Sequence, residues 1–367
     1  MKNKISNFFK NSFLRISLAC LLVVLFFMVS FGLPFSLKAP LLFVNTIAGS
    51  GLSGSVDGVA KTARFNWPTG VAIGDDGTVF VADYSNNQIR KIDLKGKVST
   101  LSGSGEAGFA DGKGSGAMLW GPDNIALDLN GDIIIGDADN FRIRRLTQDG
   151  QLTTIAGNGR MGFRNGALLQ AEFGYPTGVA VDGEGIIYIA DRRLHMIRKI
   201  TAEGKVVILG GHGSSGFVNG KGVKARFNNP IALVALVDGT LFVADSGNNA
   251  IRKVTPDGVV TTVAGGKKKG YRDGKGEDAL FSWPTGIAAG KDGDLFVCDS
   301  SNNMIRRISS TGVVSTIAGS LTKGARDGDA LRSSFSFPTG IAIGAKGDIY
   351  IADSGNNKIR KISLGDR

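Results

Sequence analysis

Three basic side chains stand close together in the segment Asp191-Arg192-Arg193-Leu194-His195. Arg192 and Arg193 could hold a carboxylate or a phosphate, because a guanidinium group donates paired hydrogen bonds to such groups. His195 could act as an acid or a base, since an unperturbed imidazole titrates near neutral pH. A turn whose basic side chains are merely solvated is the alternative interpretation of this segment.

A second group of polar residues is Asp123 and Asn124, which follow Gly121-Pro122, with Asp139 a short distance downstream. Carboxylate and amide oxygens are ligands that Ca²⁺ prefers, so calcium is the one cofactor that this group suggests. His195 and His212 are the only histidines, and no metal-ligand spacing links them. We therefore assign no metal ligand and no catalytic residue from the sequence.

These two segments stand out because the rest of the chain repeats. One proline recurs every 54 residues inside a phrase of the type Trp67-Pro68-Thr69-Gly70, at Pro68, Pro122, Pro176, Pro230, Pro284 and Pro338. A period of this length with several short strands in each unit is typical of a β-propeller, whose sheets must stack against their neighbours.

Each unit contains four apolar segments with strand character. In the first unit they are residues 71–73, 79–82, 88–92 and 98–101, separated by turns rich in Gly and Asn. Four strands make one propeller blade. The sequence therefore predicts an all-β, six-bladed propeller over residues 41–367, with four strands in each blade.

The ends of the chain predict how the ring closes. The last unit stops after residues 359–362 and lacks a fourth strand of its own, whereas residues 44–49 match the fourth strand of the first unit, 98–103. We expect the N-terminal strand to complete the C-terminal blade, which would remove the exposed sheet edges of an open ring.

The first forty residues have a different character. Residues 1–15 are basic, and residues 16–36 form a largely uncharged, apolar segment. About 18 apolar residues are near the lower limit for crossing a bilayer and more than a signal peptide usually needs. We expect a transmembrane anchor or a signal segment, and whether it is cleaved stays open. The basic residues before it predict a cytoplasmic N-terminus and a propeller outside the cytoplasm.

The net charge of +11 raises the question of nucleic acid binding. Five of the positive charges lie in the first forty residues, which contain no acidic residue, so the remainder carries +6. Each unit also has an Arg followed by Lys or Arg, such as Arg90-Lys91. We favour pairing of this Arg with an Asp of its own blade, such as Asp83, and do not expect a nucleic acid partner.

An aromatic residue precedes the unit proline in four of the six copies, at Trp67, Tyr175, Trp283 and Phe337. This position predicts either packing between blades or an aromatic rim that contacts a sugar or a peptide. In an up-and-down blade these residues and the turns after the second strand lie on one face of the disk. The scaffold therefore carries its variable loops on that face, where ligands are usually bound.

The repeated phrase resembles the NHL repeat family. The last unit shows it most fully, as Pro-Thr-Gly-Ile-Ala-Ile from Pro338 and Ile-Ala-Asp-Ser-Gly-Asn-Asn-Lys-Ile-Arg-Lys from Ile351. The resemblance implies a six-bladed propeller. It implies less about function, because members and related propellers are protein-binding platforms, RNA-binding domains, extracellular sensors, lyases or lactonases. Calcium-dependent lactonases of this shape use a Glu, Asn and Asp set on the axis, which we cannot place in this chain.

The function predicted from the sequence is an exported, membrane-anchored propeller that binds a protein, peptide or glycan without catalysis. The candidate ligand-binding residues are Arg192, Arg193, His195, Asp123 and Asn124. The alternative is a metal-dependent hydrolase or lactonase with its site at the central channel.

Overall fold

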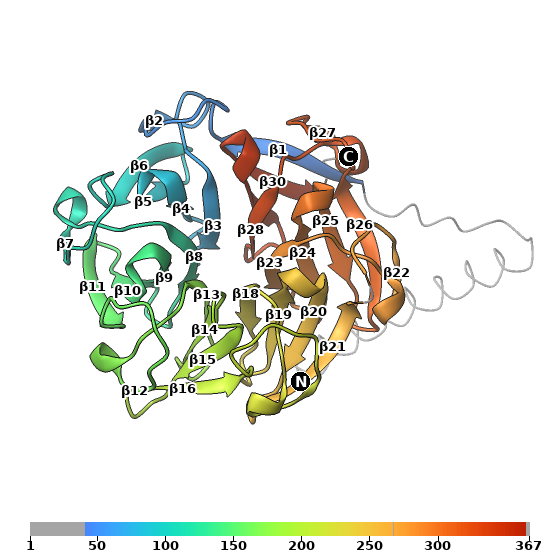
Figure 1. Cartoon of the computed structure of the whole chain (residues 1–367). Coiled ribbons are helices and arrows are strands. Elements are labelled where there is room, and N and C mark those ends of the chain that lie inside the picture. Colours follow the sequence, from blue (N-terminus) through green and yellow to red (C-terminus); the bar gives the residue numbers. More distant parts are fainter. Residues whose placement is uncertain (1–40, 267, 365–367) are drawn as a thin grey trace, which may run out of the picture. The chain divides into compact units, whose positions relative to one another are not determined.

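The strands of this protein form six separate antiparallel sheets arranged as a ring (Figure 1). The computed structural model describes residues 41–266 and 268–364. The predicted basic segment 1–15 and apolar segment 16–36 lie outside the described residues. None of the helices within the described ranges has the length and apolar character that a membrane crossing requires.

The first sheet shows the plan of every blade. From the inside of the ring outward it contains β3 (Pro68–Ile73), β4 (Val79–Asp83), β5 (Gln88–Ile92), β6 (Lys97–Ser102) and β2 (Gly58–Val59). The four predicted strands are confirmed. The sequence did not predict β2, a two-residue strand of the preceding connector, in which Gly58 pairs with Val98 at the outer edge.

The other blades repeat this order. The second blade contains β8 (Pro122–Leu127), β9 (Ile133–Asp137), β10 (Arg142–Leu146), β11 (Gln151–Ala156) and β7 (Gly112–Lys113), and the third contains β13 (Pro176–Val181), β14 (Ile187–Asp191), β15 (Met196–Ile200), β16 (Lys205–Gly210) and β12 (Gly166–Ala167). The fourth blade contains β18 (Pro230–Ala235), β19 (Leu241–Asp245), β20 (Ala250–Val254), β21 (Val259–Gly265) and β17 (Gly220–Lys221), and the fifth contains β23 (Pro284–Ala289), β24 (Leu295–Asp299), β25 (Met304–Ile308), β26 (Val313–Gly319) and β22 (Gly274–Lys275). The sixth blade contains β28 (Pro338–Ile343), β29 (Ile349–Asp353), β30 (Lys358–Leu364), β1 (Leu42–Ala48) and β27 (Gly328–Asp329).

Short 3₁₀ helices occupy two recurring places in the described chain. Those after the second strand of a blade are η1 (Tyr84–Asn86), η3 (Ala138–Asn140), η6 (Ser246–Asn248), η8 (Ser300–Asn302) and η10 (Ser354–Asn356). Those after the outermost strand are η2 (Gly114–Gly116), η4 (Leu168–Gln170), η5 (Gly222–Lys224), η7 (Gly276–Asp278) and η9 (Ala330–Arg332). In the third blade a plain turn follows β14 instead, and it contains Arg192 and Arg193.

The N-terminal strand closes the ring as predicted. β1 lies between β27 and β30, and it pairs with both in antiparallel fashion. Val44 lies opposite Ile362 and is completely buried. The last sheet is therefore built from both ends of the propeller, which covers two edges that would otherwise be open.

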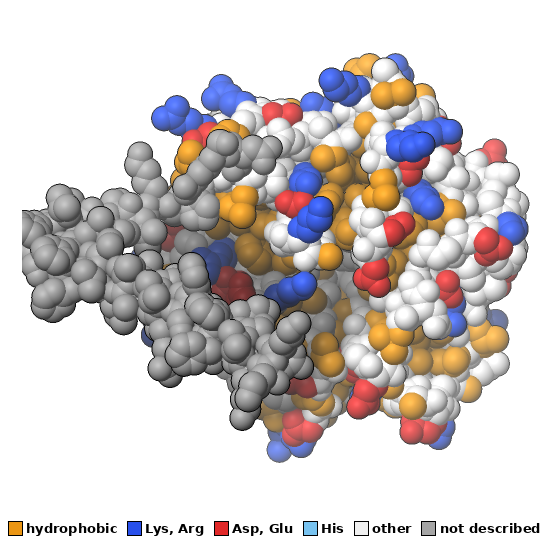
Figure 2. Space-filling view, turned by 180° about the vertical axis from the view of Figure 1, so that it is seen from behind, with side chains coloured by type: hydrophobic (Ala, Val, Ile, Leu, Met, Phe, Trp, Pro, Cys, Tyr) orange, Lys and Arg blue, Asp and Glu red, His pale blue; other side chains and the backbone are white. Residues whose placement is uncertain are grey.

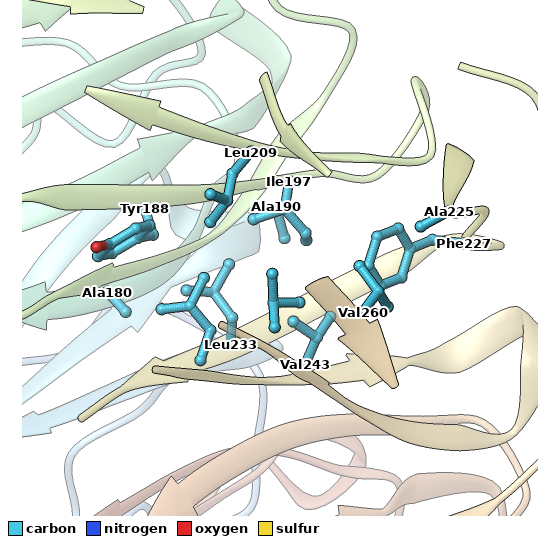
Figure 3. Packing of buried hydrophobic residues seen from close by; sticks show 12 residues of the cluster. Ala180, Tyr188, Ala190, Ile197, Leu209, Ala225, Phe227, Leu233, Val243 and Val260 are labelled. Atoms are coloured by element: carbon cyan, nitrogen blue, oxygen red, sulfur yellow. The ribbon is translucent and has the colours of Figure 1, made fainter. Parts of the chain in front are cut away.

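The hydrophobic core lies between neighbouring blades. Figure 3 shows one layer, in which Tyr188 and Ile197 of the third blade face Phe227, Leu233 and Val243 of the fourth. Both faces of most sheets are covered in this way, so the second strands are continuous apolar runs. Burial of such side chains stabilises by about 1.5–3 kcal/mol each.

A buried Arg ties each blade to its connector, where its partner is Asp in four blades and Asn165 or Asn219 in the third and fourth. In the first blade the Arg90 guanidinium donates to Asp83 at 2.7 Å and to Asp57 at 2.6 Å, and the Arg90 side chain is completely buried. The predicted pairing of Arg90 with Asp83 is confirmed. Asp57 also accepts a hydrogen bond from the Thr100 amide and so anchors the connector.

The remaining charges are dispersed. On the face drawn in Figure 2, Lys and Arg side chains occur in small groups between acidic and apolar ones. Exposed ion pairs of the described chain include Lys113 with Asp149 and Lys221 with Asp257, and pairs of this kind contribute little to stability.

Candidate ligand cavity at the mouth of the channel

One residue from each inner strand stands around the mouth of the central channel, at the position after the unit proline. Where this residue is Thr, its hydroxyl donates to a carbonyl of the next blade. For example, the Thr69 hydroxyl donates to the Asp123 carbonyl oxygen at 2.6 Å, and the Thr339 hydroxyl donates to the Thr69 carbonyl oxygen at 2.9 Å. In the second and fourth blades Asp123 and Ile231 replace Thr, so the ring of hydroxyl groups is interrupted at these two places.

Above this ring lies a cavity of about 260 Å³ to which all six blades contribute. It is lined by Trp67, Thr69, Tyr84, Asp123, Asn124, Tyr175, Arg192, Ile231, Trp283, Thr285, Phe337 and Thr339. Three of the five residues predicted to bind a ligand, Asp123, Asn124 and Arg192, therefore lie in one cavity.

The walls of the cavity are aromatic. Trp67, Trp283 and Phe337 have φ angles of 54°, 55° and 50°, a backbone conformation that is strained for bulky residues. An Asn of the preceding blade holds each of them, because its side-chain oxygen accepts the backbone N–H at 2.8–2.9 Å. The structure shows both an aromatic rim around a cavity and packing between blades, because the ring centroids of Trp67 and Phe337 lie 5.9 Å apart. Contact of this rim with a sugar or a peptide stays a prediction.

Tyr175 reaches the cavity in a different way. In the preceding blade Phe141 replaces the Asn, and the Tyr175 amide donates to Asp191 instead. The Tyr175 backbone does not adopt a positive φ. Its hydroxyl lies 2.8 Å from that of Tyr84, and both hydroxyl groups lie 3.2 Å from one oxygen of Asp139.

The second blade makes room for this cluster. Gly121 occupies the position where other blades have an aromatic residue or Asn, and a Cβ there would collide with the Asp139 carboxylate and press on the Tyr84 ring. Burial raises the pKa of Tyr84 and of Tyr175. Both phenols are therefore neutral near pH 7 and can donate to Asp139.

Asp123 is half-buried in the cavity. Burial raises the pKa of Asp123 to about 6, Arg192 opposes the shift and Asp139 adds to it. Within the described part of the chain, no hydrogen bond or ion pair to the Asp123 carboxylate is found. Such a carboxylate needs water or a ligand as its partner.

Arg192 takes a position where three other blades have Ser. Ser300, for example, donates to the Pro338 carbonyl at 2.6 Å and ties two blades together. Arg192 keeps a backbone bond to the Tyr175 carbonyl at 3.0 Å, and its guanidinium lies 5.9 Å from the Trp283 ring. In the described chain this guanidinium has no hydrogen-bonded partner, so it too is available to a ligand.

Arg193 and His195 lie outside this cavity. Arg193 is exposed and borders a neighbouring hollow together with Tyr175, Arg192 and Asn229. His195 has a φ of 55°, and its Nδ1 accepts the Asn229 amide at 3.0 Å. It performs the structural task of the Asn that it replaces, and burial lowers its pKa.

Asn124 stands where most units have Gly, and the change is matched on the adjacent strand. In the other blades the residue before the buried Asp is Ala or Cys, whereas the second blade has Gly136. A Cβ on Gly136 would lie 2.6 Å from the carbonyl oxygens of Pro176 and Thr177. In the second blade the larger side chain of this pair, Asn124, is therefore on the inner strand, where it lines the cavity.

The described residues contain no group of three or more His, Cys, Asp or Glu side chains that could hold a metal ion. His195 and His212 do not meet, since His212 is exposed and bonds to Ser214. Five cavity residues were not predicted from the sequence, namely Tyr84, Ile231, Thr69, Thr285 and Thr339. Tyr84 could have been recognised as a departure from the repeat, because three other units have Ser at the same position.

Six blades, a closing N-terminal strand and a cavity at the channel mouth define a six-bladed β-propeller with an axial cavity. Residues 65–92, 281–308 and 335–362 match the NHL repeat. The chain is therefore an NHL-repeat propeller protein, as the resemblance in its sequence implied.

Two curated relatives are similar in sequence to most of this chain. Protein SUPPRESSOR OF QUENCHING 1, chloroplastic, of Arabidopsis thaliana is 32% identical over 71% of this chain and 27% of its own length. NHL repeat-containing protein 2 of Homo sapiens is 30% identical over 69% of this chain and 40% of its own length. The chain thus spans less than half the length of these relatives.

Solved structures share the fold. An auxiliary nutrient binding protein from Bacteroides ovatus has a TM-score of 0.68 at 17% identity, covering 89% of this chain and 78% of that one. A streptogramin B lyase has a TM-score of 0.56 at 18% identity, covering 89% and 98%. Propellers of this shape therefore include binding proteins and enzymes, and the site has to decide between them.

Proposed function

We propose that this protein is a non-catalytic binding module whose mouth cavity receives a small polar ligand or the end unit of a peptide or glycan. One observation carries the proposal. The residues that depart from the repeat at the mouth, among them Tyr84, Asp123, Asn124 and Arg192, converge on one cavity. Substitutions without a function would not be expected to line the same cavity.

The chemistry of the lining favours binding. Flat aromatic faces, a free carboxylate, a free guanidinium and an amide are the groups that orient a polar ligand. The nearest histidine to them in sequence, His195, is engaged with the Asn229 backbone. The described residues offer no cluster for a metal ion, so the hydrolase alternative has no specific support.

The proposed function includes a place in the cell. The basic segment 1–15 and the apolar segment 16–36 support an exported propeller that an anchor or signal directs across the membrane. Protease added outside intact cells should digest the propeller. Protection of the propeller in intact cells, with digestion only after lysis, would contradict this placement.

The binding function is tested with the full chain purified in detergent. Sugars, amino acids and short peptides are added at millimolar concentrations, and the melting temperature is followed, because a ligand that binds the native state stabilises it by mass action. Any ligand found should lose its effect in Trp283→Ala. The matched control is Trp120→Ala, which removes a 48% exposed Trp that does not line the cavity. Equal loss in both variants would count against the cavity.

A further inference from the structure

Two opposite charges in the mouth cavity do not pair with each other. The Asp123 carboxylate and the Arg192 guanidinium are both half-buried and both line the cavity. Among the described residues neither has an ion-pair partner. This contrasts with the buried Arg of each blade, such as Arg252, which is paired with Asp245 at 2.8 Å. Partly buried charges without a partner are costly, so they indicate a complementary ligand.

The two charges polarise the cavity. Asp123 lies near Asp139, and both carboxylates contribute to raising the pKa values of Tyr84 and Tyr175. The Arg192 guanidinium lies 5.9 Å from the Trp283 ring. A space of about 260 Å³ is therefore lined by carboxylate and guanidinium groups that carry opposite charges.

We propose, resting on the binding function above, that the ligand is a zwitterion of the amino-acid type, with its ammonium group at Asp123 and its carboxylate at Arg192. A guanidinium binds a carboxylate through two parallel hydrogen bonds. The ammonium group meets the Asp123 carboxylate in a cavity that Tyr84 and Tyr175 also line. The apolar part of the ligand contacts the aromatic rim.

Singly charged or neutral ligands fit this cavity less well. A carboxylate alone leaves Asp123 without a counter-charge and is repelled by Asp123 and Asp139. An amine alone is repelled by Arg192. A sugar supplies hydroxyl dipoles but compensates neither charge. Free amino acids and short peptides share the required chemistry, and the experiment separates them.

The test uses the full chain in detergent and isothermal titration calorimetry with matched probes. L-Leucine and glycyl-L-leucine are the zwitterions. Isopentylamine is leucine without its carboxylate, 4-methylpentanoate is leucine without its ammonium group, and methyl glucoside is the neutral probe. We expect one of the two zwitterions to bind at least tenfold more tightly than either half-probe. The better zwitterion identifies the source of the ligand.

The variants return the site to the residues of other blades, where these residues fold without strain. Asp123→Thr restores the ring hydroxyl, and Arg192→Ser restores the bond made by Ser300. Neither should lower the melting temperature, because each replaces an unpaired charge by a hydroxyl group that can form a hydrogen bond. Asp123→Thr should weaken the zwitterion at least tenfold without weakening 4-methylpentanoate, and Arg192→Ser should weaken the zwitterion without weakening isopentylamine.

Affinity should also depend on pH. The groups that face Asp123 are Arg192, Asp139, Tyr84 and Tyr175. With a pKa of about 6 for Asp123, lowering the pH from near 8 to near 5 protonates about nine-tenths of this carboxylate and weakens the zwitterion about tenfold. The same change should have little effect in Asp123→Thr. A dependence that persists in Asp123→Thr would contradict the proposal.

The outcomes separate the two levels of the argument. Tight binding of methyl glucoside, lost in Trp283→Ala, with no heat from either zwitterion would overturn the ligand class and keep the binding function. Half-probes that bind as tightly as the zwitterion would also overturn it. If none of the probes binds, the zwitterion proposal is wrong, and the wider ligand panel with Trp283→Ala decides the binding function alone.

Discussion

The hydroxyl groups of Tyr84 and Tyr175 lie 2.8 Å apart, although 91 residues of chain separate them. Tyr84 belongs to the first blade and Tyr175 precedes the third, so the contact spans the second blade at the mouth of the channel. It is accommodated by Gly121, whose missing side chain leaves the space that Tyr84 and Asp139 fill. The sixfold repeat is thereby broken on one side, and the cavity acquires a distinct shape and charge.

Loss of this contact should be measurable. Tyr84→Phe removes the hydroxyl that bonds to Tyr175 and Asp139, and we expect it to lower the free energy of unfolding by about 0.5–1.5 kcal/mol. Urea denaturation followed by fluorescence provides the measurement. Tyr271→Phe is the control, because Tyr271 is 44% exposed and no hydrogen bond of its hydroxyl is found in the described chain. Equal effects of the two substitutions would show that the hydroxyl contact contributes nothing.

The closing strand should be essential for stability. Val44→Asp places a charge at a completely buried position between β27 and β30, and we expect a loss of several kcal/mol or no folded protein. Val59→Asp is the matched control, since Val59 of β2 is 68% exposed. The melting temperature of each variant gives the comparison. A Val44→Asp protein as stable as the control would contradict closure of the ring by β1.

The buried ion pairs should be costly to break on one side. Arg252→Met leaves the completely buried Asp245 without its counter-charge, and it also removes bonds to Val218 and Asn219. We expect a loss of about 3–5 kcal/mol in urea denaturation. The neighbouring Lys253→Met changes a half-buried lysine and should cost much less. Similar costs for both residues would refute a special role of the Arg–Asp pair.

His195 should make the stability depend on pH. Its Nδ1 accepts the Asn229 amide only while this nitrogen is unprotonated, and burial lowers the pKa of His195 below that of a free imidazole. The unfolded state therefore binds more protons, so this contribution is present above about pH 6.5 and is lost as the pH falls. The melting temperature of wild type should drop more than that of His195→Asn between about pH 7.5 and pH 5. Parallel curves for the two proteins would exclude this role.

Much of the fold was predictable because each unit contains the same residue pattern. The proline phrase, the apolar second strand and the Asn-rich turn recur at a constant spacing, and a match between residues 44–49 and 98–103 indicated the closing strand. The pair of Arg90 with Asp83 was predictable because both recur in every unit. The outermost two-residue strand was not, since Gly58 and Val59 carry no strand pattern of their own.

The site was predictable only in part. Asp123, Asn124 and Arg192 attracted attention as polar departures from the repeat, and all three line the cavity. His195 departs as plainly, yet its side chain performs the task of an Asn at the junction with the next blade. Tyr84 was missed because an aromatic residue in a turn does not by itself indicate a ligand site.

The sequence alone determined the number of blades, the four inner strands of each blade and the way the ring closes, because these follow from local patterns repeated at one spacing. Only the tertiary structure decided which departures face a common space. Residues at the same level of different blades meet at the axis whatever their distance along the chain, and their direction depends on backbone angles and on gaps such as the one at Gly121. Those are properties of the closed ring, and no single unit contains them.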